Sequence, residues 1–186
     1  MLSNFRADLR QHFGSNVNLR SIAYAFFEMS LWAIAVFRFG KWVLRLRIWL
    51  FRWPLTIVYF LAYKVVGAVS GIQISSESEI GAGLVIHNFG GVYIRGNLGK
   101  NCVVVQGAQL ISRANGRALG WPTLGDNVYV GSGAKILGNV KIGSNSRIGA
   151  NAVVTRDIPD DSLVLPPECK VIAGYYRFNK KGIGES

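Results

Sequence analysis

The sequence predicts a mainly β protein in which a triangular prism of short parallel strands follows a helical segment. Two observations predict this fold. An aliphatic residue recurs at every sixth position between residues 74 and 154, with one interruption, whereas residues 19–69 are strongly apolar with a helical pattern. Half of the 186 residues are hydrophobic, which suits one moderate domain with an appendage. We therefore divide the chain into an N-terminal helical segment (1–70), a repeat domain (71–174) and a short C-terminal tail (175–186).

The N-terminal segment carries few turn signals. Pro54 is expected to end one helix and to open the next. The longest run without charge, Trp53–Tyr63, is shorter than the roughly 18 residues that a spanning helix needs, so no transmembrane helix is expected. The first twenty residues also lack the apolar core and cleavage site of a secretory signal.

The basic charge of the chain is concentrated in this segment. Residues 1–72 hold nine Lys/Arg and two Asp/Glu. If residues 38–52 form one helix at about 100° per residue, four cations make a narrow stripe beside an apolar face rich in Trp and Phe. The four cations are Arg38, Lys41, Arg45 and Arg52. This pattern favours a membrane surface as partner over nucleic acid, which is recognised by basic residues on a polar element. The alternative is that the helix packs on the body of the protein or between subunits.

The repeat domain is defined by its inward-pointing aliphatic residues. Each is expected to stack on its equivalent eighteen residues away, with three strands to a coil. They are Ile74, Ile80, Ile86, Val92, Leu98, Val104 and Leu110, followed by Leu124, Val130, Ile136, Ile142, Ile148 and Val154. The longer spacing between Leu110 and Leu124 predicts that residues 113–122 leave the prism as a loop, and such loops are often functional.

Cysteines and histidines are few. Cys102 and Cys169 have the spacing of neither a disulfide framework nor a zinc site, so a reducing compartment, the cytoplasm, is expected. A metal centre is not expected, because the repeat domain holds a single histidine and a zinc site built from three histidines cannot form in it.

The stretch "GSGAKILGNVKIGSNSRIGANAVVTRDIP", residues 131–159, resembles the hexapeptide-repeat acyltransferases. The likeness is greatest to the serine acetyltransferase type, and the leader suggests the bacterial polysaccharide O-acetyltransferases within it. This resemblance implies a left-handed parallel β-helix, acetyl transfer from acetyl-CoA, and a homotrimer with active sites between neighbouring prisms.

The resemblance also implies a set of residues that contact CoA. They are Ser132, Ala150, Thr155, Arg156 and Lys170. Small residues would let the pantetheine arm lie along the prism wall, and the two cations would hold phosphates. The alternative for Ser132 and Ala150 is that the coil turns require small residues. Pro166, Pro167 and Glu168 depart from the family pattern just before Cys169, which affects the local CoA contacts.

The catalytic candidate is His87, in the stretch "IHNFGG". Acetyl transfer to a hydroxyl needs a base for the hydroxyl proton, and neutral imidazole has a suitable pKa. Backbone amides of the "FGG" turn are candidate donors to the oxyanion. His12 lies in the N-terminal segment and is given no role. The alternative is that His87 is a polar corner residue without catalytic function.

The acceptor side departs from serine acetyltransferases at three places. His87 and Asn88 stand where those enzymes have Asp and then His, Gln73 replaces an upstream aspartate, and Trp121 replaces a second histidine. These changes favour a larger acceptor, such as a sugar ring stacked on Trp121. Glu77 or Glu79 is a candidate for the missing acid.

We expect an acetyl-CoA-dependent O-acetyltransferase that modifies a sugar hydroxyl, in bacterial exopolysaccharide or capsule synthesis. The saccharide acceptor, lipid-linked in one version of this hypothesis, would be met on the inner face of the cytoplasmic membrane. Two alternatives stay open: a serine O-acetyltransferase, and a non-catalytic β-helix that binds CoA or scaffolds an assembly.

Overall fold

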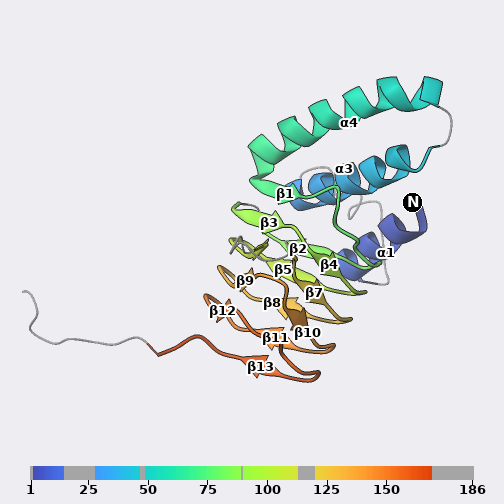
Figure 1. Ribbon diagram of the computed structural model, residues 1–186. Coiled ribbons are helices and arrows are strands. Elements are labelled where there is room, and N and C mark those ends of the chain that lie inside the picture. The colour runs from blue at the N-terminus through green and yellow to red at the C-terminus, as the bar shows by residue number, and fades with distance from the viewer. Residues whose placement is uncertain (1, 15–27, 47–48, 89, 113–119, 169–186) are drawn as a thin grey trace, which may run out of the picture.

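A computed structural model describes residues 2–14, 28–46, 49–88, 90–112 and 120–168, and in them three helices precede a stack of parallel strands (Figure 1). The helices are α1 (Leu2–Phe13), α3 (Met29–Leu44) and α4 (Trp49–Ser70). Figure 1 shows α3 lying on the upper end of the stack and α4 lying above α3.

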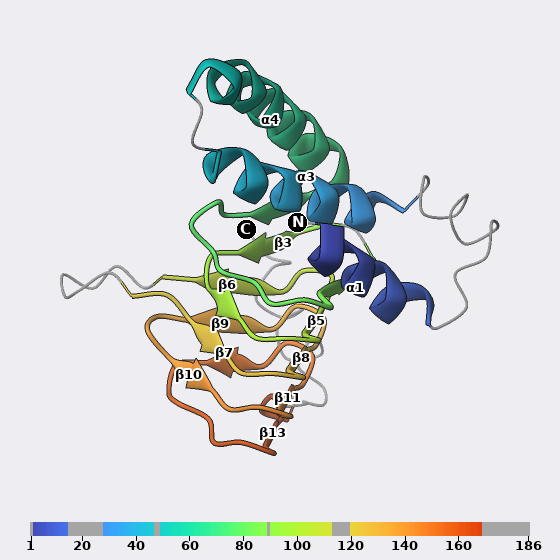
Figure 2. The same ribbon diagram turned by 90° about the vertical axis from the view of Figure 1, so that its right-hand side faces the viewer.

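The strands form three parallel sheets, one for each side of a prism (Figure 2). Sheet A holds β1 (Ile72–Ile74), β3 (Val92–Ile94), β6 (Gln109–Ile111), β9 (Lys135–Leu137) and β12 (Val153–Val154). Sheet B holds β4 (Asn97–Leu98), β7 (Thr123–Leu124) and β10 (Lys141–Ile142). Sheet C holds β2 (Val85–His87), β5 (Val103–Val105), β8 (Tyr129–Val130), β11 (Arg147–Ile148) and β13 (Leu163–Val164). The predicted fold class, a mainly β prism after a helical region, is confirmed.

The inward aliphatic residues stack as predicted, with one slip in the period. In sheet A, Ile94 pairs with Ile74 on one side and with Leu110 on the other, so Ile94 holds the place predicted for Val92. Val92 is also buried but pairs with Ile72. The slip arises because the turn after Ile86 is two residues longer than the equivalent turn in the next coil, and a shorter turn before Leu98 restores the phase. The strict six-residue spacing is therefore wrong at the turn that contains His87.

Helix α3 closes the upper end of the prism. Ala33, Ile34 and Phe37 belong to the same buried cluster as the first-coil residues Ile72 and Ile74. An end coil has no neighbour on one side, so its apolar residues need such a cap to be removed from water.

The predicted basic stripe on one helix is wrong. Helix α3 ends at Leu44 and α4 begins at Trp49, so Arg38 and Arg52 lie on different helices. Arg38 is buried, with its guanidinium turned toward the β-helix, and Lys41 bonds to Glu79. For these two residues the alternative of packing on the body of the protein is the one that holds. Pro54 lies inside α4 and does not divide it; it costs the helix one backbone hydrogen bond near its start.

Helix α4 nevertheless exposes a large apolar surface. Its exposed hydrophobic side chains are Leu50, Trp53, Ile57, Val58, Phe60, Leu61, Val65 and Val69, which we call the α4 face. By length and composition, Arg52–Ser70 is apolar enough to cross a membrane, and little of it is buried. The charge-free run Trp53–Tyr63 is thus part of a longer apolar helix that Lys64 interrupts, and the expectation of no transmembrane helix stays a prediction. One such helix is weak evidence for a span.

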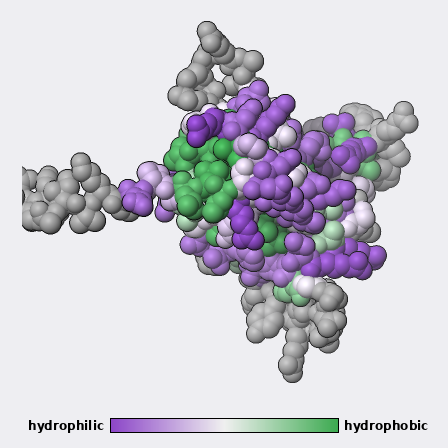
Figure 3. All heavy atoms as spheres, turned by 90° about the horizontal axis from the view of Figure 1, so that it is seen from below, coloured by the Kyte–Doolittle hydropathy of each residue, from purple (hydrophilic) through white to green (hydrophobic). Residues whose placement is uncertain are grey.

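A second, smaller apolar area lies at the opposite end of the prism, beside the start of the C-terminal residues (Figure 3). The exposed large hydrophobic residues of the last coil are Val153, Leu163 and Leu165. The predicted loop (113–122) is described only at residues 120–122, and the predicted tail (175–186) lies outside the described residues.

Candidate active site

The edge of the prism at which sheet C turns into sheet A gathers several of the predicted residues, and we call it the His87 edge. A ladder of hydrogen bonds runs along it. The Gln106 N–H donates to the His87 carbonyl at 3.1 Å, and the Ser132 hydroxyl and Gly133 N–H donate to the Gln106 carbonyl at 3.1 and 2.9 Å. The Asn151 N–H then donates to the Ser132 carbonyl at 2.8 Å. His87, Ser132 and the neighbouring Ala150 therefore lie along one continuous edge.

The turn at His87 has an unusual backbone. Asn88 has a φ of 61°, and Gly90 and Gly91 have φ values of 105° and 67°. These left-handed conformations suit Asn and Gly. These residues allow the turn to hold two residues more than the equivalent turn of the next coil. His87 and Asn88 are both exposed in this turn. The His87 side chain is therefore open to a ligand.

The predicted oxyanion donors are only partly available. The Gly90 N–H donates to the Ser70 carbonyl at 2.9 Å, so this amide is already used to join the turn to the end of α4. Gly91 is the remaining glycine amide of the turn. Phe89 lies outside the described residues.

A different edge, between sheets A and B, carries the other predicted residues, and we call it the Trp121 edge. Trp121 stands just before β7, and the Arg95 guanidinium lies over its ring at 5.5 Å from the centroid. Thr155 and Arg156 follow β12 on the same edge and are exposed. Gln73 lies exposed in β1, in register with Tyr93.

Within one chain, the structure thus brings His87 and Asn88 together with Ser132 and Ala150. It does not bring them to Trp121, Thr155 or Arg156, because the two edges belong to different corners of the prism. Lys170 lies outside the described residues.

Neither predicted acid reaches His87. Glu77 bonds to Arg95 at 2.8 Å, and Glu79 bonds to Lys41 at 2.6 Å and pairs with Arg45 at 3.7 Å. Both carboxylates lie on the Trp121 edge or below α3, because they belong to the turn between β1 and sheet B. The hypothesis that one of them replaces the missing aspartate is wrong for the single chain.

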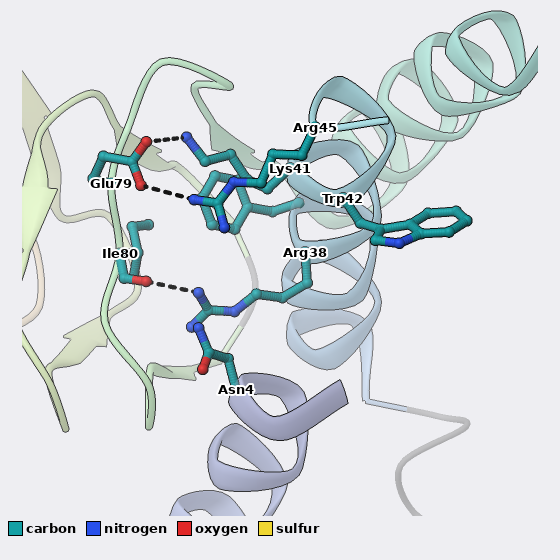
Figure 4. Close-up of a pocket in the computed structure, with 8 residues that line it drawn as sticks. Asn4, Arg38, Lys41, Trp42, Arg45, Glu79 and Ile80 are labelled. Carbon is teal, nitrogen blue, oxygen red and sulfur yellow. Dashed lines mark hydrogen bonds and ion pairs between the residues drawn. The ribbon is translucent and has the colours of Figure 1, made fainter. Parts of the chain in front are cut away.

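A pocket of about 150 Å³ lies between α1, α3 and the first coil, next to this charge cluster (Figure 4). Figure 4 shows Lys41 and Arg45 turned toward Glu79, and Arg38 turned toward the Ile80 carbonyl. The charged side chains of this pocket are paired with Asp8, with Glu79 and with backbone carbonyls, so the pocket joins the helices to the prism and we do not take it as the candidate site.

The residue that the sequence reasoning missed is His12. Its ring lies 6.0 Å from the His87 ring, centroid to centroid, with an angle of 33° between the planes. The sequence held one signal for this contact. Asp8 and His12 lie four residues apart and so share one face of a helix, and Asp8 turns that face toward the β-helix. Burial lowers the pKa of His12; Glu28 opposes this effect, and His87 adds to it.

Comparison with known proteins agrees with this architecture. Residues 122–156 match the family model described as "Bacterial transferase hexapeptide (six repeats)". Over these residues the β-helix is similar to the hexapeptide-repeat transferases. Among known proteins, a serine acetyltransferase of Synechococcus elongatus is 36% identical over 126 residues, which cover 67% of this chain and 52% of that protein. One from Staphylococcus aureus is 38% identical over 112 residues, covering 57% of this chain and 53% of the relative.

Solved structures of serine acetyltransferases have a similar fold. A serine acetyltransferase of Neisseria gonorrhoeae aligns with a TM-score of 0.73 at 25% identity, over 92% of this chain and 65% of that one. Serine acetyltransferase isoform 3 of Entamoeba histolytica, solved with cysteine, aligns with a TM-score of 0.71 at 22% identity, over 96% of this chain and 63% of that one. The fold is thus the left-handed β-helix of these transferases with a helical N-terminal region. The chain spans about half the length of the curated relatives.

Proposed function

We propose that this chain is an acetyl-CoA-dependent O-acetyltransferase and that His87 is its general base. One observation carries the proposal. The β-helix resembles those of serine acetyltransferases, and the only histidine of its repeat domain is exposed on a glycine turn, on the edge that also carries Ser132 and Ala150. An exposed imidazole beside a surface of small residues suits proton removal next to a bound thioester.

In the proposed reaction the acceptor oxygen attacks the carbonyl carbon of the acetyl thioester. His87 takes the hydroxyl proton as the new C–O bond forms, and the C–S bond then breaks. The proton passes from the imidazolium to the CoA sulfur, so the products are the acetyl ester and free CoA thiol. The base is regenerated, and no other reactant is needed.

The residues present fit CoA in part. Ser132 and Ala150 place small side chains on the His87 edge, which suits the pantetheine arm, and Arg156 is an exposed cation that can hold a phosphate. Because Thr155 and Arg156 lie on the Trp121 edge, one CoA molecule can meet both sets only between two neighbouring prisms. This separation supports a homotrimer in which each site is shared by two chains.

The names of the relatives favour L-serine as the acceptor, and it is our first candidate. A sugar hydroxyl is the second candidate. Trp121 supports it, because its indole lies under Arg95 on the edge that would face His87 of a neighbouring chain, and aromatic faces suit sugar rings. A saccharide of a bacterial exopolysaccharide or capsule pathway would be an acceptor of this kind.

The α4 face supports a location at the inner surface of the cytoplasmic membrane. Leu50 and Trp53 are 68% and 69% exposed, Phe60 is 56% exposed, and α4 contains no acidic residue. A helix with Trp and Phe on an open apolar face, together with Arg52 and Lys64, has the composition of helices that lie at anionic lipid surfaces. We propose that α4 holds the enzyme there, where a lipid-linked saccharide would be accessible.

The test is release of CoA thiol from acetyl-CoA by the full chain, with L-serine and with short or lipid-linked oligosaccharides as parallel acceptors. His87→Gln is the test variant, and Lys135→Gln, at an exposed strand position of sheet A, is the control that should keep the wild-type rate. We expect release with one acceptor class and a loss of about 100-fold or more in His87→Gln. Release unaffected by His87→Gln would refute the assigned base. Binding of CoA with no release for any acceptor would favour the non-catalytic alternative.

A further inference from the structure

The chain contains two histidines, and the fold brings them together although they are separated by 75 positions. His12 comes from the last turn of α1 and His87 from the end of β2. Their ring centroids are 6.0 Å apart and the ring planes are inclined by 33°. At this separation the rings are neighbours without a direct hydrogen bond, and a small rotation of one ring or one water molecule can connect them.

Helix α1 is fixed in the place that this contact requires. Asp8 is completely buried, and its carboxylate accepts hydrogen bonds from the Gly83 and Leu84 N–H groups, both at 2.8 Å. His12 follows Asp8 by about one helical turn on the same face of α1. His87 follows Leu84 by three residues along the chain that becomes β2. The contact that anchors α1 therefore also brings His12 to His87.

His12 has an unsatisfied polar atom at this point. Its Nδ1 is buried, and no described residue forms a hydrogen bond with it. A buried nitrogen without a partner is unfavourable, and in a native structure it calls for a water molecule, a ligand or a functional explanation. Phe13 packs edge-on against the same ring at 4.8 Å, so the imidazole is held in its orientation.

Burial keeps His12 neutral at neutral pH. Burial lowers its pKa, Glu28 opposes this, and a protonated His87 would lower it further. The carboxylates of Glu77 and Glu79 bond elsewhere and do not serve His87. A neutral imidazole is thus the titratable group that the described structure places beside the candidate base.

Building on the proposed function, we propose that His12 is the positioning residue of His87. Helix α1 supplies a second imidazole where a carboxylate would otherwise orient the base. When His87 takes the proton of the acceptor hydroxyl, neutral His12 accepts a hydrogen bond from the imidazolium, directly or through one water. Two adjacent imidazolium ions would repel each other, so the pair takes up its two protons in separate steps.

The first test does not depend on activity. Since the chain has two histidines, the imidazole signals of the full chain can be followed by NMR between pH 5 and 8.5. We expect each histidine of the wild type to report the titration of the other as a second inflection. In His12→Phe, which keeps an aromatic ring, His87 should titrate in one step. Arg10→Gln, an exposed change on the same helix, should leave the wild-type curves unchanged.

The second test uses the acceptor that supports thiol release in the wild type. We expect His12→Phe to lower kcat roughly 10-fold to 100-fold, to leave KM for acetyl-CoA within about twofold, and to change the acid limb of the pH–rate profile. His12→Gln, which can form a hydrogen bond but cannot take the proton, should show the same single-step titration of His87. It also replaces His12→Phe if that variant fails to fold.

The two tests separate the two proposals. Single-step titration of His87 that is the same in the wild type and both His12 variants would overturn the role of His12, whatever the activity. Unchanged kcat and pH profile in an active enzyme would overturn it as well. Coupled titration in a protein that releases no thiol would support the histidine pair and count against the proposed reaction instead.

Discussion

Asp8 and Arg38 form a buried ion pair, with 3.0 Å between the Arg38 Nε and an Asp8 carboxylate oxygen. Arg38 also donates to the carbonyls of Ile80 at 2.7 Å and Gly81 at 2.5 Å, while Asp8 accepts two backbone N–H groups of the first coil. One cluster therefore joins α1, α3 and the β-helix. Both charges are hydrogen-bonded on several sides, which is the condition under which a buried pair is tolerated.

Replacing Arg38 should destabilise the protein strongly. In Arg38→Met the Asp8 carboxylate stays buried without its cation, which typically costs about 3–5 kcal/mol. Urea unfolding of the full chain, followed by circular dichroism, measures this. Lys41→Met is the matched control on the same helix, because its partner Glu79 is exposed and such pairs contribute about 0–1 kcal/mol. If the two variants lose the same free energy of unfolding, the buried Asp8–Arg38 pair contributes no more to stability than the exposed Lys41–Glu79 pair does.

The prism was predictable because its repeat and its core are the same feature. Inward residues stack on partners eighteen positions away, as Ile136 does on Val154 and Ile148 on Val130. The spacing in the sequence therefore gives the register of the strands directly. The slip at Val92 was not predictable from spacing. Val92 and Ile94 are both aliphatic and both buried, and only the register of β1 with β3 distinguishes them.

The candidate site was predictable only in part. His87 stood out as the single histidine of the repeat domain. The roles of Arg38 and His12 depend on contacts across thirty and seventy-five positions, and a helical pattern gives the face of a residue without its partner. For the same reason the basic stripe was placed at a lipid surface, although Arg38 points to Asp8.

Core and surface positions of the prism should respond differently to truncation. Ile136 is fully buried between Leu110 and Val154, so Ile136→Ala should cost about 2–5 kcal/mol of unfolding free energy. Val153 lies in the strand next to it but is 57% exposed, so Val153→Ala should change stability by no more than about 0.5 kcal/mol. Thermal unfolding of the two variants tests this. A large loss in Val153→Ala would mean that another surface covers β12 in solution.

Cys102 should be unreactive in the folded protein. Burial is the main cause that raises the pKa of its thiol to about 11, so at pH 8 only about one molecule in a thousand carries the thiolate. In a Cys169→Ser background, an aromatic disulfide reagent of the kind that can detect free CoA thiol should label Cys102 only after unfolding in urea. Fast labelling of the folded protein would show that the first coils open readily. The same measurement establishes the background of the activity assay.

Binding to anionic vesicles should depend on the α4 face. Trp53→Glu with Leu61→Glu places two carboxylates among exposed apolar residues of α4 and should weaken binding to vesicles that contain phosphatidylserine by about 10-fold or more. Vesicle flotation of the full chain measures this, with phosphatidylcholine vesicles for comparison. Val153→Glu with Leu163→Glu is the matched control, because it changes the exposed apolar residues at the other end of the prism. Equal loss in both double variants would indicate general hydrophobic adhesion rather than a surface on α4.

The stability of the protein should fall on mild acidification partly because of His12. Its pKa is lower in the folded chain than the usual value of 6.5, since burial disfavours the imidazolium more than Glu28 favours it, and His87 adds repulsion. The unfolded chain therefore binds the proton more readily, and stability is lost as the pH falls from 6.5 toward the folded pKa. Urea unfolding at pH 8 and pH 5.5 should show a larger loss for the wild type than for His12→Phe, because the variant has no imidazole to protonate at that position. Arg10→Gln should follow the wild type, and parallel losses in the wild type and His12→Phe would contradict a lowered pKa at His12.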